Sequence, residues 1–246
     1  MTDQAAQPAA VGRRAMILAA GLGLRMHPLT ATVPKPLIEL AGKPLIAYAL
    51  DRLKAAGVER IVVNVHHLPE QIERWAHAQD APPIVISDER ERLLDTGGGV
   101  ASALPLLGNE PFVVLNSDSV WIEGAKPALD RMRQAWRGAE MDALLLVSST
   151  ARAVGYGGPG DFHLDPEGRL ARRAPNQVAP FVFAGCYLAA PRLFAAAPEG
   201  PFSMNLLWDR ALAAGRLYGI RHDGLWLHVG TPEAIAPAER ALADVR

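Results

Sequence analysis

Two cations, Arg25 and Lys35, stand in a segment rich in glycine and proline, LAAGLGLRMHPLTATVPKPL, which spans residues 18–37. Glycine lacks a Cβ atom, so the backbone N–H groups around Gly21 and Gly23 can approach a bound anion closely. A lysine adds a compact charge, and an arginine adds a forked one. The glycine amides and the two cations together predict a loop that binds phosphate groups.

A carboxylate, Asp118, ends the apolar stretch PFVVLNSD at residues 111–118. In an open parallel sheet, ligands bind beyond the carboxyl ends of the strands, so this side chain is expected to point into a cleft. Mg²⁺ prefers oxygen ligands and often takes one or two carboxylates together with substrate phosphates. Asp118 is therefore a candidate metal ligand, and capping of a turn or helix is the alternative interpretation.

The apolar segments that must position these residues alternate as in an α/β protein. Predicted strands occupy residues 15–20, 60–65, 83–89 and 111–118, and predicted helices occupy residues 44–57, 69–78 and 100–107. Strand–helix alternation favours right-handed crossovers and a sheet covered on both faces. The prediction is a doubly wound, mostly parallel, Rossmann-like sheet. Pro28, Pro34 and Pro36 exclude a regular helix directly after the glycine loop.

The second half of the chain is less regular. Strands are predicted at residues 143–149, 181–190 and 225–230, a hairpin at 155–170, and helices at 205–215 and 231–245. We expect this half to form a smaller lid on the same compact unit. Residues 1–12, rich in Ala, Gln and Pro, are expected to be a disordered leader.

Composition excludes several classes of function. The chain has 25 Lys and Arg against 26 Asp and Glu, so its formal charge of -1 argues against nucleic acid or a membrane surface as the partner. A lone cysteine, Cys186, excludes a disulfide framework and a four-cysteine zinc site, and its apolar neighbours predict a core residue. No apolar run approaches the roughly 20 residues of a membrane span. These features predict a cytoplasmic protein.

The glycine loop fits neither common nucleotide motif. A dinucleotide fingerprint needs a third glycine, and a Walker A loop needs G-K-[ST]; both are missing here. The pattern AAGxGxRM…PLT…PKPL instead resembles that of the sugar nucleotidyltransferases. The resemblance extends from Ala15 to about Leu242, with TGGG at 96–99, the strand ending in Asp118, GDF at 160–162 and VGTPE at 229–233 in the family order.

The resemblance implies that the chain transfers a nucleoside monophosphate from a nucleoside triphosphate to a sugar phosphate. It assigns the nucleotide to a part of about residues 13–142 and the sugar to a part of about 143–246. It implies roles for the following residues: Ala19, Ala20, Gly21 and Gly23 hold the triphosphate, Arg25 and Lys35 act on the reacting phosphates, Thr96 and Gly97 contact the nucleoside, Gly160, Asp161 and Asn205 contact the sugar, and Asp118 holds the metal. Glu89 is a candidate contact to the base, with a solvated surface charge as the alternative.

One position departs from the family. Where its members typically carry a second metal-binding aspartate, two residues before the glycine of VGT, this chain has His228. Histidine suits manganese or zinc better than the harder magnesium ion. The expected cofactor is therefore Mg²⁺, with Mn²⁺ as the alternative and His228 as a candidate second ligand. The alternative to an enzyme is a regulatory protein of the same family that has lost catalytic activity.

Among the members of this family, the compact length and the elements TGGG, GDF and VGTPEAI are most similar to those that transfer UMP from UTP. The implied acceptor is a sugar 1-phosphate, N-acetylmuramate α-1-phosphate, and the implied setting is peptidoglycan recycling. Transfer of GMP to a heptose or mannose phosphate is the alternative. We expect a monomer or a weak homo-oligomer, with no nucleic acid and no membrane as partner.

Overall fold

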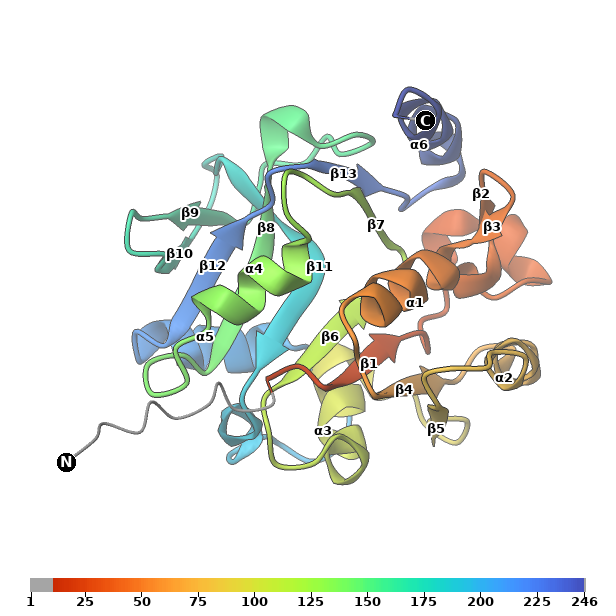
Figure 1. Cartoon of the computed structure of the whole chain (residues 1–246), viewed down its shortest axis with the longest axis horizontal. Coiled ribbons are helices and arrows are strands. Elements are labelled where there is room, and N and C mark those ends of the chain that lie inside the picture. The colour runs from red at the N-terminus through yellow and green to blue at the C-terminus, as the bar shows by residue number, and fades with distance from the viewer. Residues whose placement is uncertain (1–10, 246) are drawn as a thin grey trace.

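The computed structural model describes residues 11–245, which fold around one central sheet (Figure 1). Of the expected disordered leader, residues 1–12, the first ten lie outside the described residues. Its last residue joins the fold. The Gly12 amide donates to the carbonyl of Pro111 at 2.8 Å, and Arg133 Nη2 donates to the carbonyl of Gly12 at 2.9 Å.

Strands and helices alternate along the first half of the chain, as the apolar pattern predicts. The strands are β1 (Arg14–Leu18), β2 (Glu39–Leu40), β3 (Lys43–Pro44), β4 (Arg60–Val65), β5 (Ile84–Asp88), β6 (Phe112–Asn116), β7 (Ser119–Ile122), β8 (Ala143–Ser149), β9 (Phe162–Leu164), β10 (Leu170–Arg172), β11 (Phe181–Ala189), β12 (Leu217–Arg221) and β13 (Leu225–His228). The α-helices are α1 (Leu45–Ala55), α2 (Pro69–His77), α3 (Asp95–Leu107), α4 (Ala128–Ala135), α5 (Asn205–Ala213) and α6 (Ile235–Ala243).

The central sheet has the order β10-β9-β11-β6-β1-β4-β5, with β8 paired to β11 and β12 paired to β8. β1 runs parallel to β4 and β6, β4 runs parallel to β5, and β8 runs parallel to β12. β11 is the exception, because it is antiparallel to β6, β8 and β9. The predicted α/β fold is confirmed, and the strand that returns to the sheet makes it mixed. The predicted hairpin is β9 and β10.

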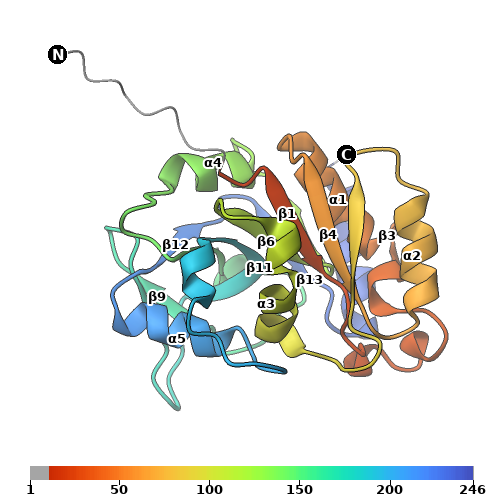
Figure 2. The same ribbon diagram turned by 90° about the horizontal axis from the view of Figure 1, so that it is seen from below.

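Helices cover both faces of this sheet, and the side chains of β1 show how the strand feeds both layers. Ala15 and Ile17 pack in one buried cluster with Leu50 of α1. Met16, between them, packs in another cluster with Val100 of α3. Figure 2 shows α1 and α4 on one side of β1 and β6, and α3 and α5 on the other. Successive residues of a strand point to opposite faces, so a strand buried on both faces needs a continuous apolar run.

Five elements were not predicted from the sequence: β2, β3, β7, α4 and β12. β7 follows Asp118 without a break and pairs antiparallel with β13, apart from the main sheet. α4 carries a short apolar stripe, in which Ala128, Leu129 and Met132 are buried. An apolar pattern of so few positions falls below what periodicity can detect.

Helix α3 begins earlier than predicted, at Asp95 instead of residue 100, so DTGGG forms its first turn. The glycines serve close packing there. A Cβ atom at Gly98 would lie 2.4 Å from the carbonyl oxygen of Gly200. The predicted helix start at residue 100 was too late because glycine clusters usually mark breaks in a helix, whereas here they let another segment lie directly on the helix.

Two exclusions made from the sequence can be compared with the structure. Cys186 is fully buried in β11, as expected of a core residue, and burial raises the pKa of its thiol far above the ordinary value. A thiol held in this protonated form is a poor nucleophile. In residues 11–245, no helix combines the length and the apolar character that crossing a membrane requires.

Candidate active site

A pocket of about 690 Å³ opens where β1, β4, β5 and β6 end. Its wall includes the loop 18–26 after β1, Asn64 near the end of β4, Glu89 after β5, and residues 116–118 at the end of β6. These four strands are parallel neighbours in the sheet, so their carboxyl ends meet at one edge. That edge is the ligand-binding position of open α/β sheets.

The loop after β1 is held in shape by its own backbone. Gly23 takes a φ of +64°, and its carbonyl accepts hydrogen bonds from the Met26 amide at 2.8 Å and the Thr30 hydroxyl at 3.0 Å. A Cβ atom at Gly23 would lie 2.8 Å from the Thr30 side chain. As the prolines predict, only short 3-10 turns follow, at Leu24–Met26, Leu29–Ala31 and Lys35–Leu37. All four predicted phosphate-loop residues line the pocket: Ala19, Ala20, Gly21 and Gly23.

Three of the charged side chains that line this pocket are the cations Arg25 and Lys35 and the carboxylate Asp118. Lys35 Nζ forms an ion pair with Asp118 Oδ2, and their side chains are only 13% and 25% exposed. Arg25 also lines the pocket, and within residues 11–245 its guanidinium has neither an ion pair nor a hydrogen bond. The pocket therefore contains an arginine, Arg25, whose donors are free for a ligand in the described part of the chain, together with the Lys35–Asp118 ion pair. This arrangement suits a ligand with several negative charges.

His228 stands next to this group of charges. In the β13–β7 ladder it lies opposite Ser119, the residue after Asp118. Burial lowers the pKa of the His228 imidazole below its ordinary value, the Asp118 carboxylate raises it, and the Arg25 and Lys35 charges lower it. The ring packs edge-on against Tyr156, with centroids 5.8 Å apart. His228 thus interacts electrostatically with the charged residues of the site, and its ring also packs against Tyr156.

The residues present fit a metal ion held largely by substrate. Within residues 11–245, no group of three His, Cys, Asp or Glu side chains could hold an ion alone. Asp118 nevertheless points its carboxylate to the pocket wall beside Lys35. Magnesium commonly uses one or two carboxylates plus phosphate oxygens, so a single aspartate suffices as the protein's contribution.

Glu89 lies in the pocket wall, and the alternative of a solvated surface charge is wrong. The residue is 3% exposed. Its Oε1 accepts a hydrogen bond from Asn64 Nδ2 at 2.7 Å, and its Oε2 accepts one from the Leu94 amide at 3.0 Å. Asn64 was missed from the sequence. The available signal was a polar amide inside IVVNV, which is otherwise an apolar run.

The two nucleoside candidates on α3 differ in their surroundings. Thr96 lines the pocket, and its hydroxyl oxygen accepts a hydrogen bond from the Met204 amide at 2.9 Å. The Gly97 amide donates to the carbonyl of Phe202 at 2.9 Å, and a Cβ atom at Gly97 would lie 2.3 Å from the Phe202 ring. Gly97 is thus a packing position, with its N–H already used inside the protein.

The three sugar candidates do not line the pocket. Gly160 has a φ of +79°, and a Cβ atom there would lie 2.1 Å from the carbonyl oxygen of Ala179. Asp161 Oδ2 accepts a hydrogen bond from the Phe183 amide at 2.9 Å. Asn205 Oδ1 accepts one from Arg172 Nη2 at 2.8 Å. The structure brings the phosphate loop, Lys35, Glu89, Thr96 and Asp118 together, and these three stand apart in internal contacts.

Comparison with known sequences points to one family. The chain matches the family described as Nucleotidyl transferase over residues 14–245. It is 47% identical over 234 residues to the N-acetylmuramate alpha-1-phosphate uridylyltransferase of Caulobacter vibrioides, covering 94% of this chain and 97% of that one. It is 37% identical to the protein of the same name from Neisseria meningitidis serogroup B, over 89% and 93% of the two chains. The mannose-1-phosphate guanylyltransferase catalytic subunit beta of Danio rerio is 30% identical, over 89% and 62%.

Solved structures show the same fold at lower sequence identity. A UDP-glucose pyrophosphorylase complexed with UDP-glucose superposes with a TM-score of 0.76 at 17% identity, over 96% of this chain and 100% of that one. The inositol-1-phosphate CTP transferase from T. maritima superposes with a TM-score of 0.73 at 18% identity, over 93% and 97%. At these identities the likeness establishes the arrangement of strands and helices.

Proposed function

The chain belongs to the nucleotidyl transferase family, and we propose that it transfers UMP from UTP to N-acetylmuramate α-1-phosphate. The products are UDP-N-acetylmuramate and pyrophosphate. The observation that carries the proposal is the 47% identity to a uridylyltransferase of that name, over 94% of this chain. The pocket at the carboxyl edge of the sheet, with an uncommitted arginine and a lysine, supports it chemically.

In the reaction, a phosphate oxygen of the acceptor attacks the α-phosphorus of UTP. The new P–O bond forms as the bond between the α-phosphorus and the bridging oxygen breaks, and pyrophosphate leaves with the electron pair. Both reactants are anions, so positioning and neutralisation of charge supply most of the catalysis. We assign neutralisation of the leaving pyrophosphate to Arg25 and contact with the reacting phosphates to Lys35. The loop amides around Gly21 and Gly23 hold the triphosphate.

A divalent ion, Mg²⁺ or Mn²⁺, belongs to this proposal. Such an ion neutralises phosphate charge and draws electron density from the reacting centre. Asp118 is the carboxylate that would hold it together with phosphate oxygens, and His228 is the neighbouring candidate. The Lys35–Asp118 ion pair holds the aspartate side chain in place before substrate arrives. Both side chains are thereby positioned for the incoming phosphates.

A screen of pyrophosphate release tests the substrate pair. UTP, GTP, CTP, ATP and TTP are each combined with N-acetylmuramate α-1-phosphate, with Mg²⁺ or Mn²⁺. N-acetylglucosamine 1-phosphate is the matched control acceptor, because it lacks only the 3-O-lactyl group, which carries the carboxylate. We expect UTP with N-acetylmuramate α-1-phosphate to give the highest kcat/KM. A preference for N-acetylglucosamine 1-phosphate would contradict the proposed acceptor.

Transfer of GMP to mannose 1-phosphate is the second candidate. It is favoured by relatives named mannose-1-phosphate guanylyltransferases that are 29–31% identical to this chain. Mannose 1-phosphate, added to the screen as a third acceptor, distinguishes the two candidates, since GTP with mannose 1-phosphate would then be the efficient pair. These relatives are less similar to this chain than the uridylyltransferase that is 47% identical, so guanylyl transfer ranks second.

We place the reaction in the cytoplasm, as a step of peptidoglycan recycling, and we propose a monomer or weak homo-oligomer. The name of the Caulobacter vibrioides relative supports the choice of a cell-wall amino sugar. We further propose that residues up to about 142 bind the nucleotide and later residues bind the sugar. The pocket supports this division in part, because nineteen of its twenty lining residues precede residue 119 and the other is Gly230.

A further inference from the structure

A chain of buried hydrogen bonds connects the phosphate loop to the start of α3. Asn64 Oδ1 accepts a hydrogen bond from the Ala19 amide at 2.7 Å, and Asn64 Nδ2 donates to Glu89 Oε1 at 2.7 Å. The other carboxylate oxygen, Oε2, accepts from the Leu94 amide at 3.0 Å. The loops that follow β1 and β5 are therefore linked through two side chains, Asn64 of β4 and Glu89. We call Asn64 and Glu89 the relay pair.

The relay pair is sealed inside the wall of the pocket. Asn64 and Glu89 are both 3% exposed. Gly99 of α3 packs directly on them, since a Cβ atom there would lie 2.7 Å from Glu89 Oε1 and 2.9 Å from Asn64 Nδ2. The last glycine of the TGGG motif thus has a physical purpose, because it leaves room for the relay.

We propose that Asn64 and Glu89 are positioning residues, which fix the phosphate-binding backbone at Ala19 relative to the nucleoside-facing residues 93–96 at the start of α3. The inference deepens the proposed function and rests on it for the identity of the nucleotide. Ala19, Asn64, Glu89 and Thr96 all line the same pocket. A rigid link between its two ends holds triphosphate and nucleoside in one geometry, and sub-ångström placement of reacting groups strongly affects rate. Glu89 acts through its neighbours, without a required contact to the base.

The relay has a polarity that can be exchanged. In the native pair, the asparagine donates and the glutamate accepts. With Asn64→Asp and Glu89→Gln together, the new carboxylate still accepts from the Ala19 amide and also accepts from the new amide at 89. The glutamine oxygen then accepts from the Leu94 amide. All three hydrogen bonds are restored, whereas the negative charge moves from position 89 to position 64.

Each single variant breaks this pattern. Asn64→Asp places two carboxylates together in a buried site, and Glu89→Gln can direct an amide against the Asn64 amide. An unsatisfied buried group or a like-charge contact disfavours the native geometry. We expect each single variant to bind UTP about tenfold more weakly, which corresponds to one broken buried hydrogen bond. The double variant is expected to return within about threefold of wild type.

The experiment measures the melting temperature of each variant. Well below that temperature, it measures UTP binding by calorimetry without acceptor, kcat and KM with acceptor, and hydrogen exchange of the Ala19 amide by NMR. Gln71→Ala is the matched control, because Gln71 Nε2 also bonds the same loop, at the Thr32 carbonyl, but in an exposed position. Gly99→Ala is an independent disruption, because its new methyl group would press on the relay pair. Gly157→Ala is its control, since nothing lies within 4 Å of a Cβ atom there.

Recovery of UTP binding and of Ala19 protection in the double variant, with normal controls, supports the relay. Recovery of melting temperature and Ala19 protection without recovery of UTP binding overturns it, and identifies the charge of Glu89 as a direct contact. Failure of the double variant to recover any property also overturns it. If wild type binds none of the five nucleotides, the proposed function fails, and Ala19 protection across the same variants still decides the relay.

Discussion

Two aspartates, Asp118 and Asp142, stand at opposite edges of the same sheet, and cationic side chains approach both. Asp118 follows β6, and Asp142 precedes β8. β6 and β8 are each antiparallel to β11, so they run in the same direction. The carboxyl end of one and the amino end of the other therefore lie at opposite edges of the sheet.

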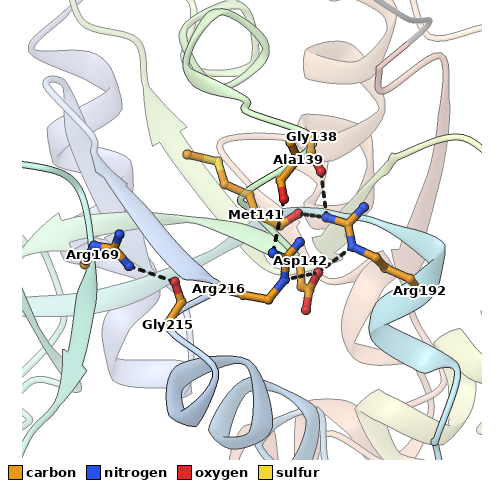
Figure 3. A network of polar contacts seen from close by, with 8 residues as sticks. All are labelled: Gly138, Ala139, Met141, Asp142, Arg169, Arg192, Gly215 and Arg216. Atoms are coloured by element: carbon orange, nitrogen blue, oxygen red, sulfur yellow. Dashed lines mark hydrogen bonds and ion pairs between the residues drawn. The ribbon is translucent and has the colours of Figure 1, made fainter.

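The cluster at Asp142 is closed on itself (Figure 3). Asp142 Oδ1 accepts hydrogen bonds from Arg192 Nε at 2.6 Å and from Arg216 Nε at 2.9 Å. Arg192 Nη2 also donates to the carbonyls of Gly138 and Met141, and Arg216 Nη1 donates to the carbonyl of Ala139 at 3.1 Å. Two arginines thus fasten the turn before β8 to the segments after β11 and α5.

The cluster at Asp118 is open by comparison. One cation, Lys35, is paired with the aspartate, and Arg25 faces the pocket without a partner in the part of the chain that the structure describes. A guanidinium that donates to a carboxylate and to carbonyls of the protein stabilises the fold, whereas one without such partners keeps its donors for a ligand. Both edges of this sheet carry arginines near an aspartate. The structural edge differs from the candidate active edge because its arginines are hydrogen-bonded to protein groups, whereas Arg25 is not, as far as residues 11–245 are concerned.

The strongest test of this contrast is removal of each aspartate's charge. Asp118→Asn keeps the size of the side chain but removes the charge that would hold a metal ion, so turnover should fall by about a thousandfold. Pyrophosphate release at saturating substrates, titrated with metal, measures the loss. We expect little change in melting temperature. Full activity in Asp118→Asn would place the metal elsewhere.

Arg25 is expected to give the next largest effect. Arg25→Ala removes a preorganised donor for the leaving pyrophosphate, which is worth about 3 kcal/mol of transition-state stabilisation. The corresponding loss in kcat is roughly 100-fold to 200-fold, with unchanged folding stability because Arg25 is exposed. Arg25→Lys serves as the control that retains charge without the fork. Near-normal turnover in Arg25→Ala would remove this residue from the mechanism.

Asp142→Asn should reverse the pattern. The amide oxygen can still accept from one arginine, and the arginines are partly exposed, with side chains 47% and 31% accessible. Solvent screening limits the cost to about 1–2 kcal/mol. The melting temperature should fall by roughly 3–6 °C for a chain of this size, with kcat unchanged. Calorimetry and the pyrophosphate assay on the same sample measure both, and a fall in kcat below the melting range would contradict the contrast.

A smaller effect is expected from pH. His222 is 4% exposed, its Nε2 lies 3.0 Å from the carbonyl oxygen of Ile122, and burial lowers the pKa of its imidazole below the ordinary value. Asp223 and Glu123 raise that pKa, and Arg131 lowers it. The unfolded chain therefore takes up a proton near pH 6.5 that the native site resists, so stability should decrease as the pH falls below that value.

Unfolding in urea at several pH values between 5 and 8 checks this expectation. His222→Gln removes one titrating group, so its free energy of unfolding should depend less on pH than that of wild type. His228, whose pKa is also lowered, keeps part of the dependence in this variant. Parallel pH profiles for the two proteins would show that His222 does not contribute.

The sequence predicted the open edge better than the closed one. Gly23, Arg25, Lys35 and Asp118 follow strands in a local pattern, so their meeting at the carboxyl edge follows from the topology alone. The Asp142 cluster joins residues far apart in the chain, with 50 positions to Arg192 and 74 to Arg216. No local pattern specifies such a contact.

The same reason explains the misassigned glycines. Gly98 and Gly99 look like a turn when only their neighbours are considered. Their helical role depends on Gly200 and on the Asn64–Glu89 pair, which lie elsewhere in the chain. Local patterns therefore predicted the elements and the phosphate loop, whereas the contacts that fill the space between elements required the structure.

The finest distinction between the two edges concerns His228, the position that departs from the family pattern. Neutral imidazole offers a metal ion one nitrogen and no negative charge, so it favours borderline metals over magnesium. His228→Asp should lower the ratio of Mn²⁺-supported to Mg²⁺-supported activity by about threefold, a modest change because Asp118 and the phosphates remain. Calorimetric titration of each metal into the UTP-bound protein provides a measurement independent of turnover.

His228→Gln is the control for this comparison, because it removes the imidazole without adding charge. The ring also packs against Tyr156 and Trp226, with centroids 5.8 Å and 5.3 Å away, so both variants should lose a similar amount of stability. If His228 belongs to the open edge, only the aspartate shifts the metal preference toward magnesium. The alternative outcome is that both variants keep the metal preference of wild type and differ from the wild-type protein only in stability. In that outcome His228 is a packing residue, and Asp118 is the one metal ligand that the protein supplies.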